Sequence, residues 1–120
     1  MVTINYETSP KHKTFSLTIR GHAGQAESGK DLVCACVSIL AYTAAHNVEF
    51  LTGIGAYTEP PTISLNEGDS TIKCKVKEQS VYKNLACRLD AVVTGFRLLR
   101  ASYPQHVTLY FNGKAEKPNI

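Results

Sequence analysis

Hydrophobic and polar residues alternate in two runs near the start of the chain. The runs cover Val2–Glu7 and Lys13–Arg20, and Ser9-Pro10 lies between them. A period of two is the spacing of a β-strand with one buried face. Because serine followed by proline favours a turn, the pattern predicts a β-hairpin at the start of the chain.

A second hairpin is predicted in the middle of the chain. Asn66-Glu67-Gly68-Asp69 is rich in turn-forming residues and separates Thr62–Leu65 from Thr71–Glu78. A last alternating run, Val107–Phe111, predicts one more strand.

Two longer stretches have the apolar spacing of helices. The first runs from Asp31 to about Leu51, and the second from Val81 to about Ser102, where Pro104 follows. The resulting order is ββαββαβ. It predicts a two-layer α/β domain in which two helices pack on one mainly antiparallel sheet.

The first helix is apolar around most of its circumference. Its main face consists of Val33, Val37, Leu40, Ala44, Val48 and Leu51. Beside that face lie Leu32, Cys36, Ile39, Thr43 and Phe50, and a narrow polar stripe remains near Asp31, Cys34, Ser38 and Tyr42. Such a helix is expected to be covered on more than one side. A second copy of the chain would cover it in a homodimer; a position wedged between the sheet and the second helix is the alternative.

The composition suits a single domain over residues 1–120. Of the 120 residues, 19% are charged and 43% are hydrophobic. The hydrophobic share is enough for one core. The net charge of +3 is too small to indicate nucleic-acid binding. No signal peptide is visible, and polar residues interrupt the longest apolar run at Leu32–Leu51, so we expect no membrane span. The four cysteines are then expected to be reduced thiols in the cytoplasm.

Three of the cysteines have structural interpretations. Cys74 shares a strand face with Ile72 and Val76, which predicts packing in the core. Cys87 lies beside the main stripe of the second helix and is expected to fill a helix contact. Cys36 is also expected to lie in the core.

Neither a metal site nor a cofactor is predicted. Cys34 and Cys36 lie roughly 200° apart around a helix, since each residue turns by ~100°, so they cannot share an ion. The four histidines show no ligand spacing.

Cys34 differs because it lies on the polar stripe near the start of the first helix. If Ser28 is the N-cap, it forms a capping box with Asp31 and Cys34 falls in the second turn. We favour Asp31 as the N-cap, because Gly29 and Lys30 suit a loop. Cys34 is then the third helical residue, where its N–H has no helix partner and the helix dipole favours a thiolate.

His22 is the candidate base for such a nucleophile. A neutral histidine can take the thiol proton and then remain beside the thiolate as a cation. His22 follows Gly21 where a strand is expected to end, and that exit can reach the start of the helix. An ordinary loop histidine is the alternative that spacing alone leaves open.

Residues 21–38 resemble the motif of the ribosomal-processing cysteine proteases (Prp). The matching residues are Gly21-His22-Ala23, a loop that reaches Gly29, Asp31-Leu32-Val33-Cys34-Ala35 and Val37-Ser38. The length and element order also fit this family, so the resemblance extends over nearly the whole chain.

The resemblance implies a cytoplasmic endopeptidase from a Firmicutes-like bacterium. Such enzymes remove a short N-terminal extension from ribosomal protein twenty-seven of the large subunit, cutting after an aromatic residue. Cys34 would be the nucleophile and His22 the general base. Asp31 would cap the helix and orient the site, and Ser38 would support Cys34. Backbone N–H groups around Val33 and Cys34 are the natural donors to the oxyanion.

The resemblance also implies a homodimer with a mobile loop over the site. The loop corresponds to Ala23, Gly24, Gln25, Ala26, Glu27, Ser28, Gly29 and Lys30. These residues offer little apolar anchorage, which agrees with mobility. Cys36 departs from the family, which usually has a small residue there. A related protease could instead act on a viral structural protein.

Two other classes of function remain as alternatives. Lys73, Lys75 and Lys77 form one strand face, which suits a ribosome- or RNA-associated module without catalysis and equally a solvated sheet surface. A thiol redox protein would need a resolving cysteine on the face of Cys34, and the sequence shows none there.

Overall fold

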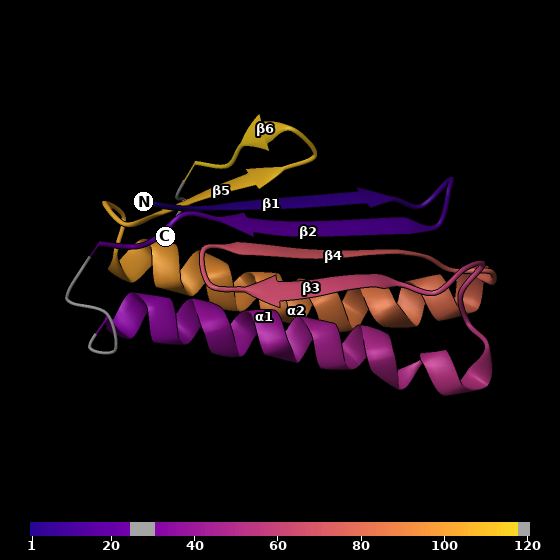
Figure 1. Ribbon diagram of the computed structural model, residues 1–120. Coiled ribbons are helices and arrows are strands. Elements are labelled where there is room, and N and C mark those ends of the chain that lie inside the picture. The colour runs from indigo at the N-terminus through magenta and orange to yellow at the C-terminus, as the bar shows by residue number, and fades with distance from the viewer. Residues whose placement is uncertain (25–30, 118–120) are drawn as a thin grey trace.

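A computed structural model describes residues 1–24 and 31–117 of the chain. The elements are β1 (Val2–Ser9), β2 (Thr14–Arg20), α1 (Leu32–Phe50), the 3₁₀-helix η1 (Thr52–Ile54), β3 (Thr62–Asn66), β4 (Asp69–Lys75), α2 (Gln79–Ser102), β5 (Val107–Phe111) and β6 (Lys114–Ala115). Figure 1 shows both long helices on one face of the sheet. The predicted two-layer α/β fold is therefore confirmed.

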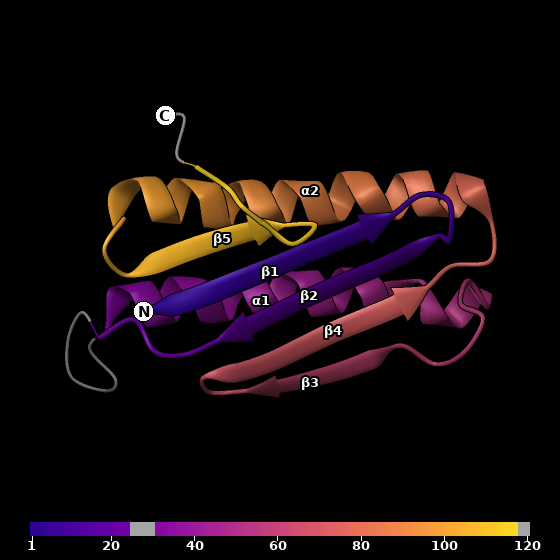
Figure 2. The same ribbon diagram turned by 90° about the horizontal axis from the view of Figure 1, so that it is seen from above.

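The six strands within residues 1–24 and 31–117 form one sheet in the order β3-β4-β2-β1-β5-β6. Neighbouring strands are antiparallel except β1 and β5, which run parallel with Val2 opposite Val107 and Tyr6 opposite Phe111. Figure 2 shows β1 lying between β2 and β5, so strands from opposite ends of the sequence are neighbours. The sheet is mainly antiparallel, as predicted.

The pairing of β2 with β4 brings two distant turns together. Arg20, the last residue of β2, lies opposite Asp69, the first residue of β4. The turn that joins β3 to β4 therefore lies beside the exit of β2. Gly68 in this turn has a φ of +75°, a left-handed conformation that glycine adopts without a steric penalty. This juxtaposition builds one side of the site.

The last strand, β6, was not predicted. Asn112 and Gly113 form its turn, and both have positive φ, at 49° and 82°. An Asn-Gly pair is a strong signal for a two-residue hairpin turn, so the sequence did contain the information. Glu116 follows β6, and its carboxylate accepts a hydrogen bond from Arg97 of α2 at 2.6 Å.

The core lies between the sheet and the two helices. Its fully buried side chains include Tyr6, Phe96, Ile4, Leu85, Leu109, Val33 and Val48. The predicted main face of α1 is buried apart from Leu40, which is half-buried. Burial of Cys74 is likewise confirmed.

Cys36 was expected in the core and Cys87 in a helix contact, but both side chains are exposed, so the core position of Cys36 is wrong. Cys36 belongs to the side of α1 on which Leu32 and Ile39 are each 64% exposed. The main face of α1 packs in the core, and nothing in the described part of one chain covers this second side. The sequence pattern indicates that the helix is apolar, but not which side the domain itself covers.

Among the described residues, one stretch is long and apolar enough to cross a membrane. It is Leu32–Ile54, with a mean hydropathy of 1.3. Length and composition are weak arguments here, because the core helix of a soluble domain has the same properties. The expected absence of a membrane span stays a prediction.

Candidate active site

Asp31 caps the N-terminus of α1. Its backbone is extended, with φ −81° and ψ 106°, and its carboxylate accepts a hydrogen bond from the backbone N–H of Cys34 at 3.0 Å. This confirms the favoured helix start and makes Cys34 the third helical residue. The Cys34 N–H, which we expected to lack a helix partner and to be available to the oxyanion, is thus already bonded to the Asp31 carboxylate. While this bond persists, the Cys34 N–H cannot donate to an oxyanion, so that expectation needs correction.

His22 lies at the exit of β2, on a backbone that close packing holds in place. A Cβ on the preceding Gly21 would lie 2.3 Å from the carbonyl oxygen of Met1, so only glycine fits there. The Gly21 N–H donates to the carbonyl of Gly68 at 3.0 Å. On the other side, a ring nitrogen of His106 lies 2.7 Å from the carbonyl oxygen of Ala23. The segment is thus held before and after His22.

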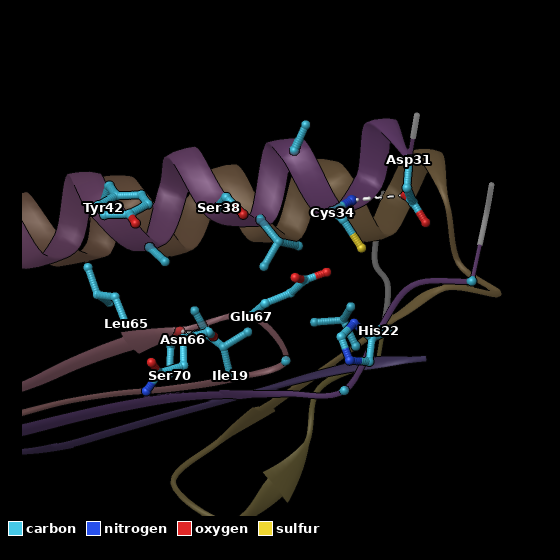
Figure 3. A pocket seen from close by; sticks show the side chains of 17 residues that line it. Ile19, His22, Asp31, Cys34, Ser38, Tyr42, Leu65, Asn66, Glu67 and Ser70 are labelled. Carbon is cyan, nitrogen blue, oxygen red and sulfur yellow. Dashed lines mark hydrogen bonds between the residues drawn. The ribbon is translucent and has the colours of Figure 1, made fainter. Parts of the chain in front are cut away.

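Cys34 and His22 line the same cleft, whose volume is about 620 Å³. Figure 3 shows the Cys34 sulfur pointing from α1 toward His22, which approaches from the sheet side. Cys34 is half-buried, so its thiol is sheltered but still reachable. A thiol at a helix start that faces an imidazole across a cleft is an arrangement suited to nucleophilic catalysis.

Most of the predicted site residues that the structure describes meet in this cleft. Gly21, His22, Gly24, Asp31, Cys34 and Ser38 all line it. Ala23 is buried, being only 3% exposed, and anchors the start of the predicted loop. The rest of that loop, namely Gln25, Ala26, Glu27, Ser28, Gly29 and Lys30, lies outside the described residues. The mobility predicted for the loop therefore stays a prediction.

The sequence interpretation missed the contribution of the β3–β4 turn. Leu65, Asn66, Glu67, Gly68 and Ser70 line the cleft opposite α1. Figure 3 shows Glu67 projecting toward the space between α1 and His22. The turn itself was predicted from its residue types. Its place in the site depends on the pairing of β2 with β4, for which the sequence offered no local signal.

The remaining candidate residues lie elsewhere. His46 is exposed on α1. No group of three potential metal ligands occurs within residues 1–24 and 31–117. Lys73, Lys75 and Lys77 are exposed and alternate with buried residues, as a solvated strand face requires.

Comparison with known proteins decides the class of enzyme. A family model described as cysteine protease Prp matches residues 1–108. The chain belongs to the Prp family. It is a cysteine protease, and the non-catalytic RNA module and the redox protein are no longer needed as explanations. The ribosomal processing cysteine protease Prp of Mycoplasma genitalium is 28% identical over 93 residues, covering 78% of this chain and 84% of its own.

Solved structures confirm the fold of this Prp family member. The Prp of S. aureus with a covalently linked product peptide is 19% identical with a TM-score of 0.65, covering 92% of this chain and 99% of its own. The same protease with a substrate peptide is 18% identical with a TM-score of 0.62 and the same coverage. SMU.848 from Streptococcus mutans is 23% identical with a TM-score of 0.61, covering 92% of this chain and 93% of its own.

Proposed function

We propose that this protease removes a short N-terminal extension from ribosomal protein twenty-seven of the large subunit and cuts after an aromatic residue. In this proposal Cys34 is the nucleophile and His22 the general base. The observation that carries it is the Cys34 sulfur pointing toward His22 across one cleft. Two relatives add support: the M. genitalium protein is named a ribosomal processing protease, and the S. aureus protein was solved with peptides.

The chemistry follows from the two side chains. His22 takes the proton of the Cys34 thiol, and the thiolate attacks the carbonyl carbon of the scissile bond. As the tetrahedral intermediate collapses, the C–N bond breaks and His22 gives its proton to the leaving amine. Water, deprotonated by His22, then attacks the carbonyl carbon of the thioester. The C–S bond breaks, the extension leaves as a peptide with a new C-terminal carboxyl group, and His22 returns the proton to the Cys34 sulfur. No cofactor or metal takes part in these steps.

The walls of the cleft suit the aromatic residue of the proposed substrate. Ile19, Val37, Ala41 and Leu65 form apolar parts of the lining, and Tyr42 adds a ring. Apolar walls with a few polar groups are typical of sites that take an aromatic side chain. Asp31 and Ser38 lie along the same wall as Cys34. Asp31 supports Cys34 through the cap, and Ser38 lies one turn further along α1.

The proposal includes a homodimer in the cytoplasm, with no membrane or nucleic acid required. The exposed side of α1 and its surroundings carry several large apolar side chains. They are Leu32, Ile39, Tyr42, Phe50, Ile54 and, from α2, Leu98, each at least 51% exposed. A second copy of the chain would cover this surface, and exposed apolar surface of this kind typically marks an interface. Ribosomal proteins are made in the cytoplasm, which fixes the proposed location.

The test is peptide cleavage followed by mass spectrometry. The substrate is the N-terminal segment of ribosomal protein twenty-seven from the same organism, and a scrambled peptide is the control. Both peptides are incubated with the wild type, Cys34→Ala and His22→Ala. We expect cleavage at one bond after an aromatic residue by the wild type only.

Other outcomes separate the parts of the proposal. Cleavage that persists in His22→Ala would show that the assignment of a Cys34–His22 dyad is wrong. If the folded wild type leaves the peptide intact while Cys34 is still alkylated much faster than Cys36, the substrate assignment is wrong. A viral structural protein would then be the next substrate to test.

A further inference from the structure

We propose that the β3–β4 turn belongs to the catalytic machinery, with Gly68 as a positioning residue that sets the orientation of the His22 imidazole. This inference rests on the proposed role of His22 as the base. Neither the motif at residues 21–38 nor the chemistry of the reaction assigns a role to this turn. It adds to the site an element from the opposite wall of the cleft.

The central observation is how closely the His22 ring lies against the backbone of Gly68. A Cβ built on Gly68 would be 2.7 Å from His22 Nε2 and 2.9 Å from Cε1. Atoms do not approach so closely without displacement, so the imidazole occupies the space of the missing side chain. The backbone of the turn therefore acts as a stop on one side of the ring.

The turn is itself fastened to the segment that carries His22. The Gly21 N–H donates to the Gly68 carbonyl at 3.0 Å. The guanidinium of Arg20, the residue before Gly21, lies 2.9 Å from the Asp69 carboxylate. It also donates to the Ser70 carbonyl at 2.7 Å. The ion pair is largely exposed and contributes little energy, but these contacts fix where the turn lies relative to His22.

Inside the turn, a further bond keeps its shape. The Ser70 hydroxyl donates to the Asn66 carbonyl at 3.1 Å. Because backbone contacts hold the turn, a side chain added at Gly68 would displace the ring and not the turn. A displacement of ~1 Å in a catalytic group can cost ~10²-fold in rate. The expected consequence is a loss of turnover with little loss of folding.

The test compares Gly68→Ala with a matched control, Gly113→Ala. Both glycines lie in two-residue hairpin turns and have left-handed backbones, with φ of +75° and +82°. A Cβ on Gly113 meets nothing within 4 Å, so the control carries the backbone strain without the contact to His22. We expect Gly68→Ala to lower kcat by ~10²-fold with KM almost unchanged, and Gly113→Ala to keep kcat within about twofold of the wild type.

A second variant separates strain from contact in another way. Asparagine tolerates the left-handed conformation better than alanine, yet it carries a Cβ. Gly68→Asn should therefore be more stable than Gly68→Ala in thermal unfolding while remaining as slow. Recovery of wild-type kcat in Gly68→Asn would assign the loss to backbone strain and overturn the proposal.

A spectroscopic measurement tests the contact without relying on proteolysis. The ring Cε1–Hε1 signal of His22, assigned with His22→Ala, should shift in Gly68→Ala and stay in place in Gly113→Ala. An unchanged signal together with wild-type kcat would overturn the inference. If the wild type cuts no peptide, the proposed function fails, and a shifted signal still establishes that Gly68 orients the ring.

Discussion

At the scale of single residues, the helix start was predictable because its chemistry is local. Asp31 is a good N-cap, and Gly29, two residues before it, favours a loop over a helical turn. The position of Cys34 in the first turn follows directly from that cap. The bond between the Asp31 carboxylate and the Cys34 N–H is a consequence of the same geometry. It follows from the N-cap assignment, yet the sequence interpretation treated this N–H as a free donor.

Replacing Asp31 tests how much the cap contributes to stability. Asp31→Ala removes the acceptor for the Cys34 N–H and should lower the free energy of unfolding by about 1 kcal/mol. Asp31→Asn keeps an acceptor oxygen, so it should lower the free energy of unfolding by only a few tenths of ~1 kcal/mol. Urea unfolding of the three proteins measures the difference. Equal losses in the two variants would mean that the carboxylate stabilises the fold by something other than capping.

Cys74 gives a prediction that depends on pH. Burial raises the pKa of its thiol from 9.0 to about 12. Above about pH 9 the unfolded chain loses this proton while the folded chain keeps it, so stability should fall as pH rises. Between about pH 7.5 and about pH 10, Cys74→Val should lose less stability than the wild type, by about 1–2 kcal/mol. Cys87→Val, at an exposed thiol, should show the same fall in stability with pH as the wild type. If stability falls equally with pH in all three proteins, Cys74 is not the group responsible.

At the scale of elements, periodicity and turn residues were enough to predict both long helices and the β1–β2 and β3–β4 hairpins. The boundaries moved by a few residues; α2, for example, begins at Gln79 and not at Val81. The order of the strands in the sheet could not be predicted, because pairing between distant strands leaves no local pattern in the sequence. For the same reason the sequence placed Cys34 and His22 in the site but not the turn at Gly68.

The contact between the two helices depends on a glycine. A Cβ on Gly95 of α2 would lie 2.6 Å from Leu40 Cδ2 of α1. Alanine normally stabilises a helix by up to ~1 kcal/mol relative to glycine, but here we expect overpacking to reverse the sign. Gly95→Ala should destabilise the protein by about 1–2 kcal/mol, as measured by chemical denaturation.

The Leu40→Ala background serves as the control for this contact. With the leucine side chain removed, Gly95→Ala should become stabilising by about 0.5–1 kcal/mol, which is the ordinary helix preference. A double-mutant cycle over the four proteins gives the coupling. If Gly95→Ala has the same effect in both backgrounds, Leu40 does not limit the approach of the helices.

At the scale of the whole molecule, the open side of α1 is a surface with large exposed apolar side chains. Ile39 lies on it at 64% exposed, and Phe50 at 71%. Ile39→Glu places a charge in the proposed dimer interface, where burial without a partner is costly. We expect the wild type to be a dimer in sedimentation equilibrium and Ile39→Glu to shift toward the monomer.

A charge added elsewhere is the control for that experiment. Ser64 is exposed on β3, whose inward positions are Ile63 and Leu65, so Ser64→Glu adds the same charge on the other side of the sheet. It should leave the oligomeric state unchanged. A wild type that is monomeric at all concentrations would refute the homodimer.

The parallel pairing of β1 with β5 has a consequence for when the protein gains activity during its synthesis. β1 ends at Ser9, yet its parallel neighbour β5 begins only at Val107. His106, just before β5, also contacts Ala23 beside the proposed base. A ribosome translating this chain must therefore release nearly all of it before β5 can pair with β1. The nascent chain cannot complete its active site early, and a truncated product would leave His22 without part of its support.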